Sequence, residues 1–232
     1  MSLQIQTSRH QLESAHFLSD FLVGQLQAGK LVAWLVPGGS NIEVSVAAMQ
    51  AVPAELRAKL AILQTDERYG SYDHVNSNWR QLRTAGFDPT GAAAFPVLAA
   101  DNRPIDQTVK RYAKTVRAVF EHADCVVGQF GIGADGHIAG ILPGSVASRS
   151  RQTVIGYKAN RFNRITMTMP TLARLDAAFA YVFGDSKQTA VQNLIAQNSS
   201  TSEQPCQILK KLPTAYLFTD QPTKITKQGV NK

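Results

Sequence analysis

The sequence has few cysteines, few charged residues and no long hydrophobic run, and each shortage excludes a class of protein. Two cysteines among 232 residues, Cys125 and Cys206, are too few for a disulfide scaffold or, by themselves, a zinc site. Apolar runs such as residues 31–36 are far too short to cross a bilayer. The first residues show no basic region followed by an apolar core, so we expect no secretory signal and a cytoplasmic location.

Charged residues are few, and basic residues outnumber acidic ones. Charged residues make up 18% of the chain and hydrophobic residues 44%, which excludes a disordered polymer and predicts a buried core, while the net charge is +7. Lysine and arginine are scattered, and aromatic residues do not alternate with them as in a base-stacking face. We therefore expect small anionic ligands as partners, and neither nucleic acid nor a membrane.

No repeat or Pro/Gly/Ser-rich linker divides the chain, so residues 1–232 are predicted to form a single domain. Leucine and alanine at spacings of three and four predict a helix over residues 10–28, with Ser8 as its N-cap. Apolar stretches typical of strands buried on both faces alternate with further helical patterns. Strands are expected at 31–36, 60–65, 94–99, 124–130, 153–157, 164–170, 178–184 and 214–219, and helices at 42–50, 105–123 and 186–197.

This alternation predicts a three-layer, Rossmann-like α/β fold, with a mostly parallel sheet and helices on both faces. Ligands of such sheets bind at the carboxyl ends of the strands. Three polar or glycine-rich clusters follow predicted strands: PGGS (37–40), DERYG (66–70) and GIGADGH (131–137). We therefore expect the functional site where these clusters meet.

The first two clusters suit an anion. Gly38, Gly39 and Ser40 would let the backbone and a hydroxyl approach an anion at a helix N-terminus, although an ordinary strand-to-helix turn uses the same residues. Asp66 and Arg68 follow a strand without a spacer. Arg68 offers a fork for a phosphate, and a solvated loop is the plainer interpretation.

Residues 131–136 formally match the G-x-G-x-x-G fingerprint of dinucleotide-binding proteins. That fingerprint requires a following helix and an acidic residue about 20 positions further on. Pro143 and Gly144 would break such a helix, and no Asp or Glu lies between Asp135 and Asp176. We therefore expect no nicotinamide cofactor.

Two further residues are candidates for chemistry. His137 follows Asp135 in the glycine-rich loop, and a histidine there suits general-base catalysis, with a structural role as the alternative. Lys187 opens a predicted helix, where a cation opposes the helix dipole unless an anion is bound. A plain exposed lysine is the alternative there.

The order of these motifs resembles one protein family. PGGS (37–40), TDERYGSYDHVNSN (65–78) and GIGADGHIAGILPGS (131–145), followed by RITMTMPTL (164–172) and GDSKQTA (184–190), resemble the 6-phosphogluconolactonases and amino-sugar-6-phosphate deaminases. The resemblance spans residues 25–220. It implies a sugar-phosphate substrate and an enzyme that needs neither a metal nor a cofactor, as a monomer or homodimer.

The two branches of the family differ at places that can be compared here. Deaminases carry Asp-Glu-Tyr where lactonases carry Asp-Glu-Arg, and this chain has Arg68. The deaminase loop continues Phe-Asn-Glu-Pro, whereas residues 140–143 read Gly-Ile-Leu-Pro. The resemblance thus implies hydrolysis of 6-phospho-D-glucono-1,5-lactone to 6-phosphogluconate, in the oxidative pentose phosphate pathway. A glucosamine-6-phosphate deaminase and a non-catalytic sugar-phosphate sensor remain the alternatives.

The resemblance also implies a role for each candidate residue. His137 would be the general base, and Asp135 would orient it. The 6-phosphate would be held by Gly38, Gly39, Ser40, Arg68 and Lys187, with Arg164 as a helper and Asp66 on the sugar hydroxyls. Some residues depart from the lactonase pattern, namely Asn41-Ile42, Ile138 and 140–142. We expect these departures to affect which substrate is bound more than how the reaction is catalysed.

Overall fold

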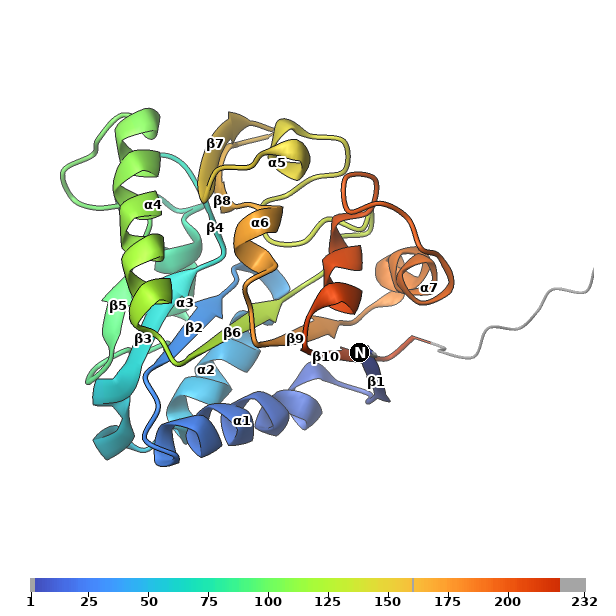
Figure 1. The fold of residues 1–232 in the computed structure, drawn as a ribbon, viewed down its shortest axis with the longest axis horizontal. Helices are drawn as coiled ribbons and strands as arrows, with labels where there is room; N and C mark the ends of the chain where they lie inside the picture. The colour runs from blue at the N-terminus through green and yellow to red at the C-terminus, as the bar shows by residue number, and fades with distance from the viewer. Residues whose placement is uncertain (1–2, 160, 222–232) are drawn as a thin grey trace, which may run out of the picture.

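The computed structural model describes residues 3–159 and 161–221, and a sheet of seven parallel strands forms its centre (Figure 1). The strands lie in the order β1-β10-β9-β6-β2-β3-β5, and every neighbouring pair is parallel. Their bounds are β1 Gln4–Thr7, β2 Val32–Val36, β3 Leu60–Gln64, β5 Ala93–Phe95, β6 Cys125–Phe130, β9 Ala177–Val182 and β10 Thr214–Thr219.

Helices cover both faces of this sheet. They are α1 Ala15–Gln27, α2 Ile42–Ala51, α3 Asn78–Thr84, α4 Ile105–His122, α5 Val146–Arg149, α6 Met169–Leu172 and α7 Gln188–Ala196. Along β2, Trp34 packs in the core formed with α1 and α2, and Leu35 packs in the core formed with α4 and α6 (Figure 1). The predicted three-layer α/β fold is therefore confirmed.

A second sheet, which the sequence analysis did not separate from the first, lies at the carboxyl side of the large one. It has the order β4-β8-β7, with β4 Asp66–Arg68, β8 Asn163–Met167 and β7 Val154–Lys158, and both pairings are antiparallel. The strands expected at 153–157 and 164–170 do exist, but not in the parallel sheet, and the second ends at Met167 because α6 begins at Met169. Hydrophobic patterning identifies a strand without identifying its partner, and the charged, three-residue β4 carries no strand pattern at all.

The N-terminal helix also differs from the prediction. Residues Gln11–Ser14 form a 3-10 turn capped by His10, and α1 begins only at Ala15. Ser8 is not the N-cap: its hydroxyl accepts a hydrogen bond from Ser14 Oγ, and its amide donates to the carbonyl of Thr219, the last residue of β10. Several other elements were not predicted from the sequence, namely β1, α3, the short helices α5 and α6, and a 3-10 helix at Pro205–Lys211.

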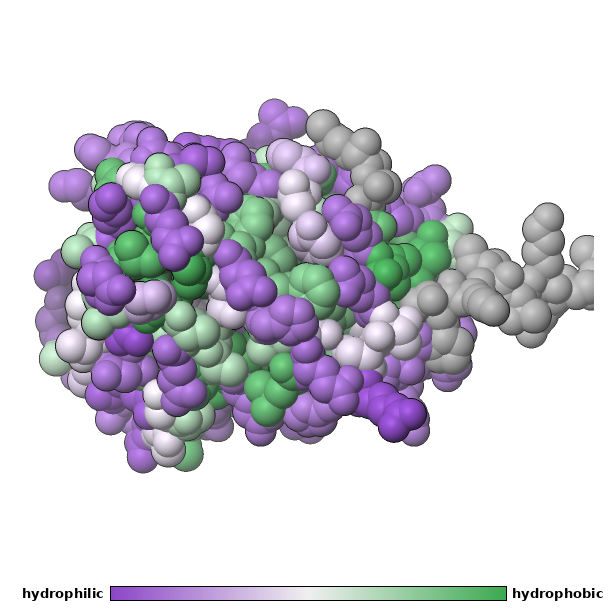
Figure 2. All heavy atoms as spheres, turned by 90° about the horizontal axis from the view of Figure 1, so that it is seen from below, coloured by the Kyte–Doolittle hydropathy of each residue, from purple (hydrophilic) through white to green (hydrophobic). Residues whose placement is uncertain are grey.

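Apolar surface is divided rather than continuous on the face shown in Figure 2, where hydrophobic patches are separated by hydrophilic side chains. None of the helices in the described part of the chain is long and apolar enough to cross a membrane.

Two glycines in regular elements provide a matched test of this packing. Gly24 is exposed on α1 and an added Cβ would meet no atom within 4 Å, whereas at Gly128 in β6 it would lie 2.4 Å from Phe130 Cε2. Gly24→Ala should raise the free energy of unfolding by about 0.5–1 kcal/mol. Gly128→Ala should lower it by about 1–3 kcal/mol, as overpacking does. Urea unfolding measures both, and shifts of the same sign would contradict the core described.

Candidate active site

The site lies where the connections of the parallel sheet change direction. From β2 the chain continues to β3 on one side, and β6 occupies the other side of β2, so the loops after β2 and β6 diverge from each other. Such a switch point leaves a crevice at the carboxyl ends of the strands. Here it holds a cavity of about 270 Å³, bounded by Pro37–Asn41, Gly131–Gly133 and residues of β4, β8 and α3.

The cavity brings together nearly all of the residues that the sequence singled out. Its lining includes Gly38, Gly39, Ser40, Asp66, Arg68, His137, Arg164 and Lys187. Asp135 does not line the cavity but stands behind His137. Lys187 ends a 3-10 turn, Asp185–Lys187, and is the N-cap residue of α7, close to its predicted place at the start of a helix.

The glycines after β2 allow close approach of two loops. Gly39 has φ +71°, a left-handed conformation that favours glycine. A Cβ on Gly38 would lie 2.2 Å from the side-chain Cγ of Asn78, so only glycine lets the amide of Asn78 pack against this turn. The turn is therefore joined to α3 by direct contact.

Three buried isoleucines, Ile132, Ile138 and Ile141, anchor the loop after β6. They form two backbone bridges, and the tight turn between them has Gly136 at φ +82°. No helix follows the strand directly, as the sequence predicted, because the next helix is the short α5. Ile138 and Ile141, two of the departures from the lactonase pattern, are therefore core residues and do not face the cavity.

His137 is oriented by Asp135. Their Nδ1 and Oδ1 atoms are 2.6 Å apart, and the same Oδ1 accepts a hydrogen bond of 3.1 Å from the His137 amide. The hydrogen bond with His137 lowers the pKa of Asp135 to about 2, so the carboxylate stays ionised at neutral pH. An ionised acceptor places the proton of a neutral imidazole on Nδ1, which leaves Nε2 free to accept a proton. A Cβ on Gly133 would lie 1.9 Å from Nδ1, so glycine is required beside the ring.

The second sheet presents the charged side chains. In its register Asp66 pairs with Thr166, and Arg68 lies directly opposite Arg164. Side chains alternate along a strand, so these four share one face and Glu67 lies on the other. Two like charges opposite each other across antiparallel strands repel, and a bound anion would relieve that repulsion.

The hydrogen-bond donors of Arg68 and Arg164 are only partly paired. Arg164 Nη1 lies 3.4 Å from Asp66 Oδ2, whereas Arg68 donates to Asn76 O at 3.2 Å and stacks 5.3 Å above the ring of Phe162. The Nε atoms of both arginines are buried, and neither has a hydrogen-bond partner among the described residues. Buried donors without partners indicate a missing acceptor.

The carboxylate of Glu67 is fully buried and lies on the face of β4 opposite to Asp66 and Arg68. Its two oxygens accept hydrogen bonds of 2.7–3.1 Å from Gln64 Nε2, Ser77 Oγ and the amides of Arg68, Asn78 and Trp79. Burial raises the pKa of Glu67, and the hydrogen bonds from Gln64, Asn78, Trp79 and Arg68 oppose that rise by stabilising the ionised form. Three of the donors are at the start of α3, so Glu67 fixes β4 to that helix N-terminus.

Sequence reasoning assigned no role to three residues that the structure places at or behind the cavity: Glu67, Asn41 and Asn78. Asn41 and Asn78 are buried and line the cavity, and each donates its Nδ2 to a backbone carbonyl, of Tyr181 and Asp66 respectively. Their Oδ1 atoms have no partner among the described residues. The one available signal was Asn41, which departs from the lactonase pattern.

The described residues contain no group of three or more His, Cys, Asp or Glu side chains arranged to hold a metal ion. Fold and cavity together define an α/β protein with a cationic site and an Asp-oriented histidine at a sheet switch point. The family model "Glucosamine-6-phosphate isomerases/6-phosphogluconolactonase" matches residues 11–217, so the chain belongs to this family.

Relatives and solved structures agree with that assignment. The chain is 30% identical to a 6-phosphogluconolactonase of Synechocystis sp., with 75% of each chain covered, and 27% identical to one of Nostoc sp., with 66% of this chain and 67% of the other covered. A 6-phosphogluconolactonase structure from Shewanella baltica superposes with a TM-score of 0.79 at 16% identity, covering 94% of this chain and 98% of that one. At that identity the superposition supports the fold.

The role of Glu67 behind the site can be tested by Glu67→Gln. The substitution places an amide donor among hydrogen-bond donors, so we expect the free energy of unfolding to fall by about 1–3 kcal/mol or more. Glu55→Gln, at an exposed position, is the control and should change stability by less than about 0.5 kcal/mol. Urea unfolding measures both. Equal stability of the two variants would show that Glu67 does not fix β4 to α3.

Proposed function

We propose that residues 1–232 form one catalytic domain that hydrolyses 6-phospho-D-glucono-1,5-lactone to 6-phosphogluconate. The observation that carries the proposal is the pair of opposed arginines, Arg68 and Arg164, which line the same cavity as the Asp-oriented His137. The buried Nε donors of both arginines lack partners among the described residues. Membership of the family and the relatives named 6-phosphogluconolactonase support the same activity.

The phosphate belongs at the cationic end of the cavity. Arg68, Arg164 and Lys187 line it together with the Gly39–Ser40 turn, which begins a 3-10 turn leading into α2. Charge-assisted bonds from guanidinium and ammonium groups are stronger than neutral ones, and guanidinium matches phosphate oxygens in pairs. A phosphate dianion there would also offset the repulsion between the two arginines.

His137 would activate water for attack on the C1 carbonyl of the lactone. Its Nε2 takes the proton as the water oxygen bonds to C1, and the ring ester bond then breaks with the proton delivered to the leaving alkoxide. Asp135, held ionised, stabilises the imidazolium that forms. The protein thus supplies the base and the cations from its own residues, and we propose that the reaction needs no metal.

Sugar hydroxyls would meet the acceptors of the cavity. Asp66 is the one carboxylate among the described lining residues, and its Oδ2 is shared with Arg164. Asn78 donates its Nδ2 to the backbone carbonyl of Asp66, and its Oδ1 has no partner among the described residues. Hydroxyl donors of the substrate match such acceptors, which favours a polyhydroxylated ring over a simple ester.

Replacing the base should reduce turnover and spare binding. His137→Asn is expected to lower kcat with 6-phosphogluconolactone by about 10²–10⁴-fold, because a positioned general base contributes that much. Affinity for 6-phosphogluconate should change little. The exposed His122 on α4 is the control, and His122→Ala should keep full activity.

Rates are measured as acid release from fresh lactone, corrected for spontaneous hydrolysis, with and without EDTA. Near-normal turnover of His137→Asn would point to Asp66 as the base instead, and loss in EDTA would refute metal independence. Ammonia release from glucosamine 6-phosphate at enzymatic rates would reverse the choice between the two branches of the family.

The phosphate site predicts a selective loss. Lys187→Ala should weaken 6-phosphogluconate binding by roughly 10- to 150-fold, and Arg68→Ala by as much or more. Lys59→Ala, at an exposed position outside the cavity, is the charge-matched control. Unphosphorylated gluconolactone should be a poor substrate for every form and lose little further in either variant. Equal harm to both lactones would place the phosphate elsewhere.

A further inference from the structure

Within the described part of the chain, one hydrogen-bonding edge of strand β7 pairs with no other strand. This strand is the last of the order β4-β8-β7 within the described residues. Ala159 N donates to Phe162 O, so in the same register Tyr157 and Ile155 exchange bonds with β8. Residues of antiparallel strands alternate in direction, and the amides and carbonyls of Gly156 and Lys158 therefore point away from the sheet.

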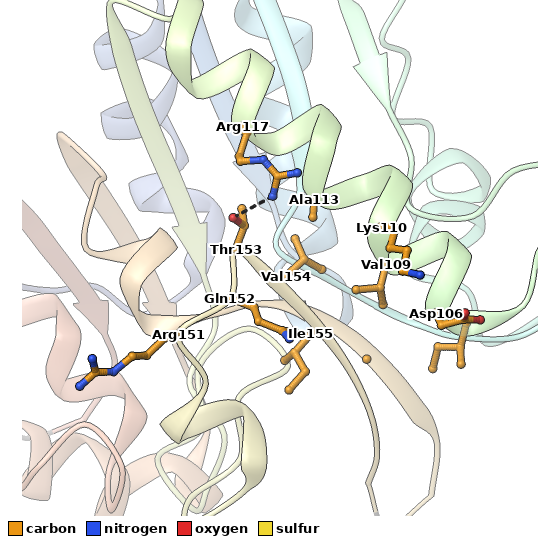
Figure 3. Close-up of a pocket in the computed structure, with 12 residues that line it drawn as sticks. Asp106, Val109, Lys110, Ala113, Arg117, Arg151, Gln152, Thr153, Val154 and Ile155 are labelled. Atoms are coloured by element: carbon orange, nitrogen blue, oxygen red, sulfur yellow. Dashed lines mark hydrogen bonds between the residues drawn. The ribbon is translucent and has the colours of Figure 1, made fainter.

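A groove of about 760 Å³ runs beside this edge, between β7 and α4 (Figure 3). Its walls are largely apolar, with Val109 and Ala113 on the helix and Val154 and Ile155 on the strand side. At Gly156 the strand and the helix are in direct contact, since a Cβ there would lie 2.9 Å from Val109 Cγ2. An extended chain laid along β7 would thus pair with the backbone and place alternate side chains in an apolar groove.

The surroundings of the groove are basic. Lys110 stands on its helix side, and Arg117 reaches across to Thr153 at 3.3 Å (Figure 3). Lys114, one turn after Lys110 on α4, and Lys158 at the end of β7 are exposed nearby. The lining contains a single carboxylate, that of Asp106, among the described residues.

We propose that the β7–α4 groove docks an extended acidic segment of another protein, which adds a strand to the edge of β7. Charge complementarity selects this occupant. A second copy of the chain would bring the same lysines and Arg117 face to face, and the net charge of +7 opposes self-pairing. Residues 222–232 carry three lysines and no acidic residue, so their charge does not match either.

The test uses the whole protein and short fluorescent peptides that alternate valine with glutamate, read by fluorescence anisotropy. A peptide alternating valine with lysine is the charge control, and a glutamate peptide N-methylated on alternate amides cannot pair with the strand. We expect the unmodified glutamate peptide to bind, and the lysine peptide and the N-methylated peptide not to bind. The binding of the glutamate peptide should weaken at high salt.

Two pairs of variants locate the contact. Lys158→Pro removes an outward amide, and Lys158→Ala removes only the charge, so the proline variant should bind about two- to tenfold more weakly than the alanine variant. Lys110→Glu combined with Lys114→Glu should weaken binding at least about tenfold, whereas Lys59→Glu, outside the groove, should not. Thermal unfolding checks that each variant folds.

Three outcomes of these binding measurements would overturn the proposal. These outcomes are no binding of the glutamate peptide, equal binding of the lysine or N-methylated peptide, and binding unchanged by Lys110→Glu combined with Lys114→Glu. A dimer in sedimentation that Lys158→Pro dissociates would show that a second copy occupies the edge. If Lys158→Pro does not fold, the N-methylated peptide still decides whether the strand edge is used.

Discussion

The architecture of the site depends on one buried ionic contact, the carboxylate of Glu67 at the N-terminus of α3. A three-residue strand has little intrinsic stability, and β4 is fixed because Glu67 binds amides on both its own strand and the helix. This contact turns Glu67 inward and, by alternation, Asp66 and Arg68 toward the cavity. Burial raises the pKa of Glu67, and the hydrogen bonds from Gln64, Asn78, Trp79 and Arg68 oppose that rise only in part.

The cavity concentrates positive charge that the residues described in the structure neutralise only in part. Arg68 and Arg164 oppose each other across β4 and β8, and Asp66 reaches only one of them, at 3.4 Å. His137 lines the same cavity, and Asp135 holds it through a short hydrogen bond. The two parts meet because the loops after β2 and β6 diverge at the switch point, which separates an anion site from a proton acceptor within one crevice.

Much of the fold and most of the candidate site were predictable from the sequence. Parallel strands buried on both faces appear as continuous apolar runs, so β2, β3, β6, β9 and β10 were found close to their true bounds. The residues following them had to meet at one edge, which places Ser40, Asp66 and His137 in one cavity. The antiparallel sheet was not separated from the parallel one, because its partners are distant in sequence and β4 is charged throughout.

The sequence by itself determined the layered fold, the edge that carries the site and the family to which the chain belongs, because these follow from local periodicity and from motif order. Only the tertiary structure decided that Arg68 faces Arg164, that Glu67 is turned away from the cavity, and that Asn41 and Asn78 keep unpaired oxygens beside it. Those facts depend on strand register and on contacts between segments far apart in the chain. Side-chain direction alternates with every residue of a strand, so a change of one position in the register of β4 would reverse the orientations of Glu67 and Arg68.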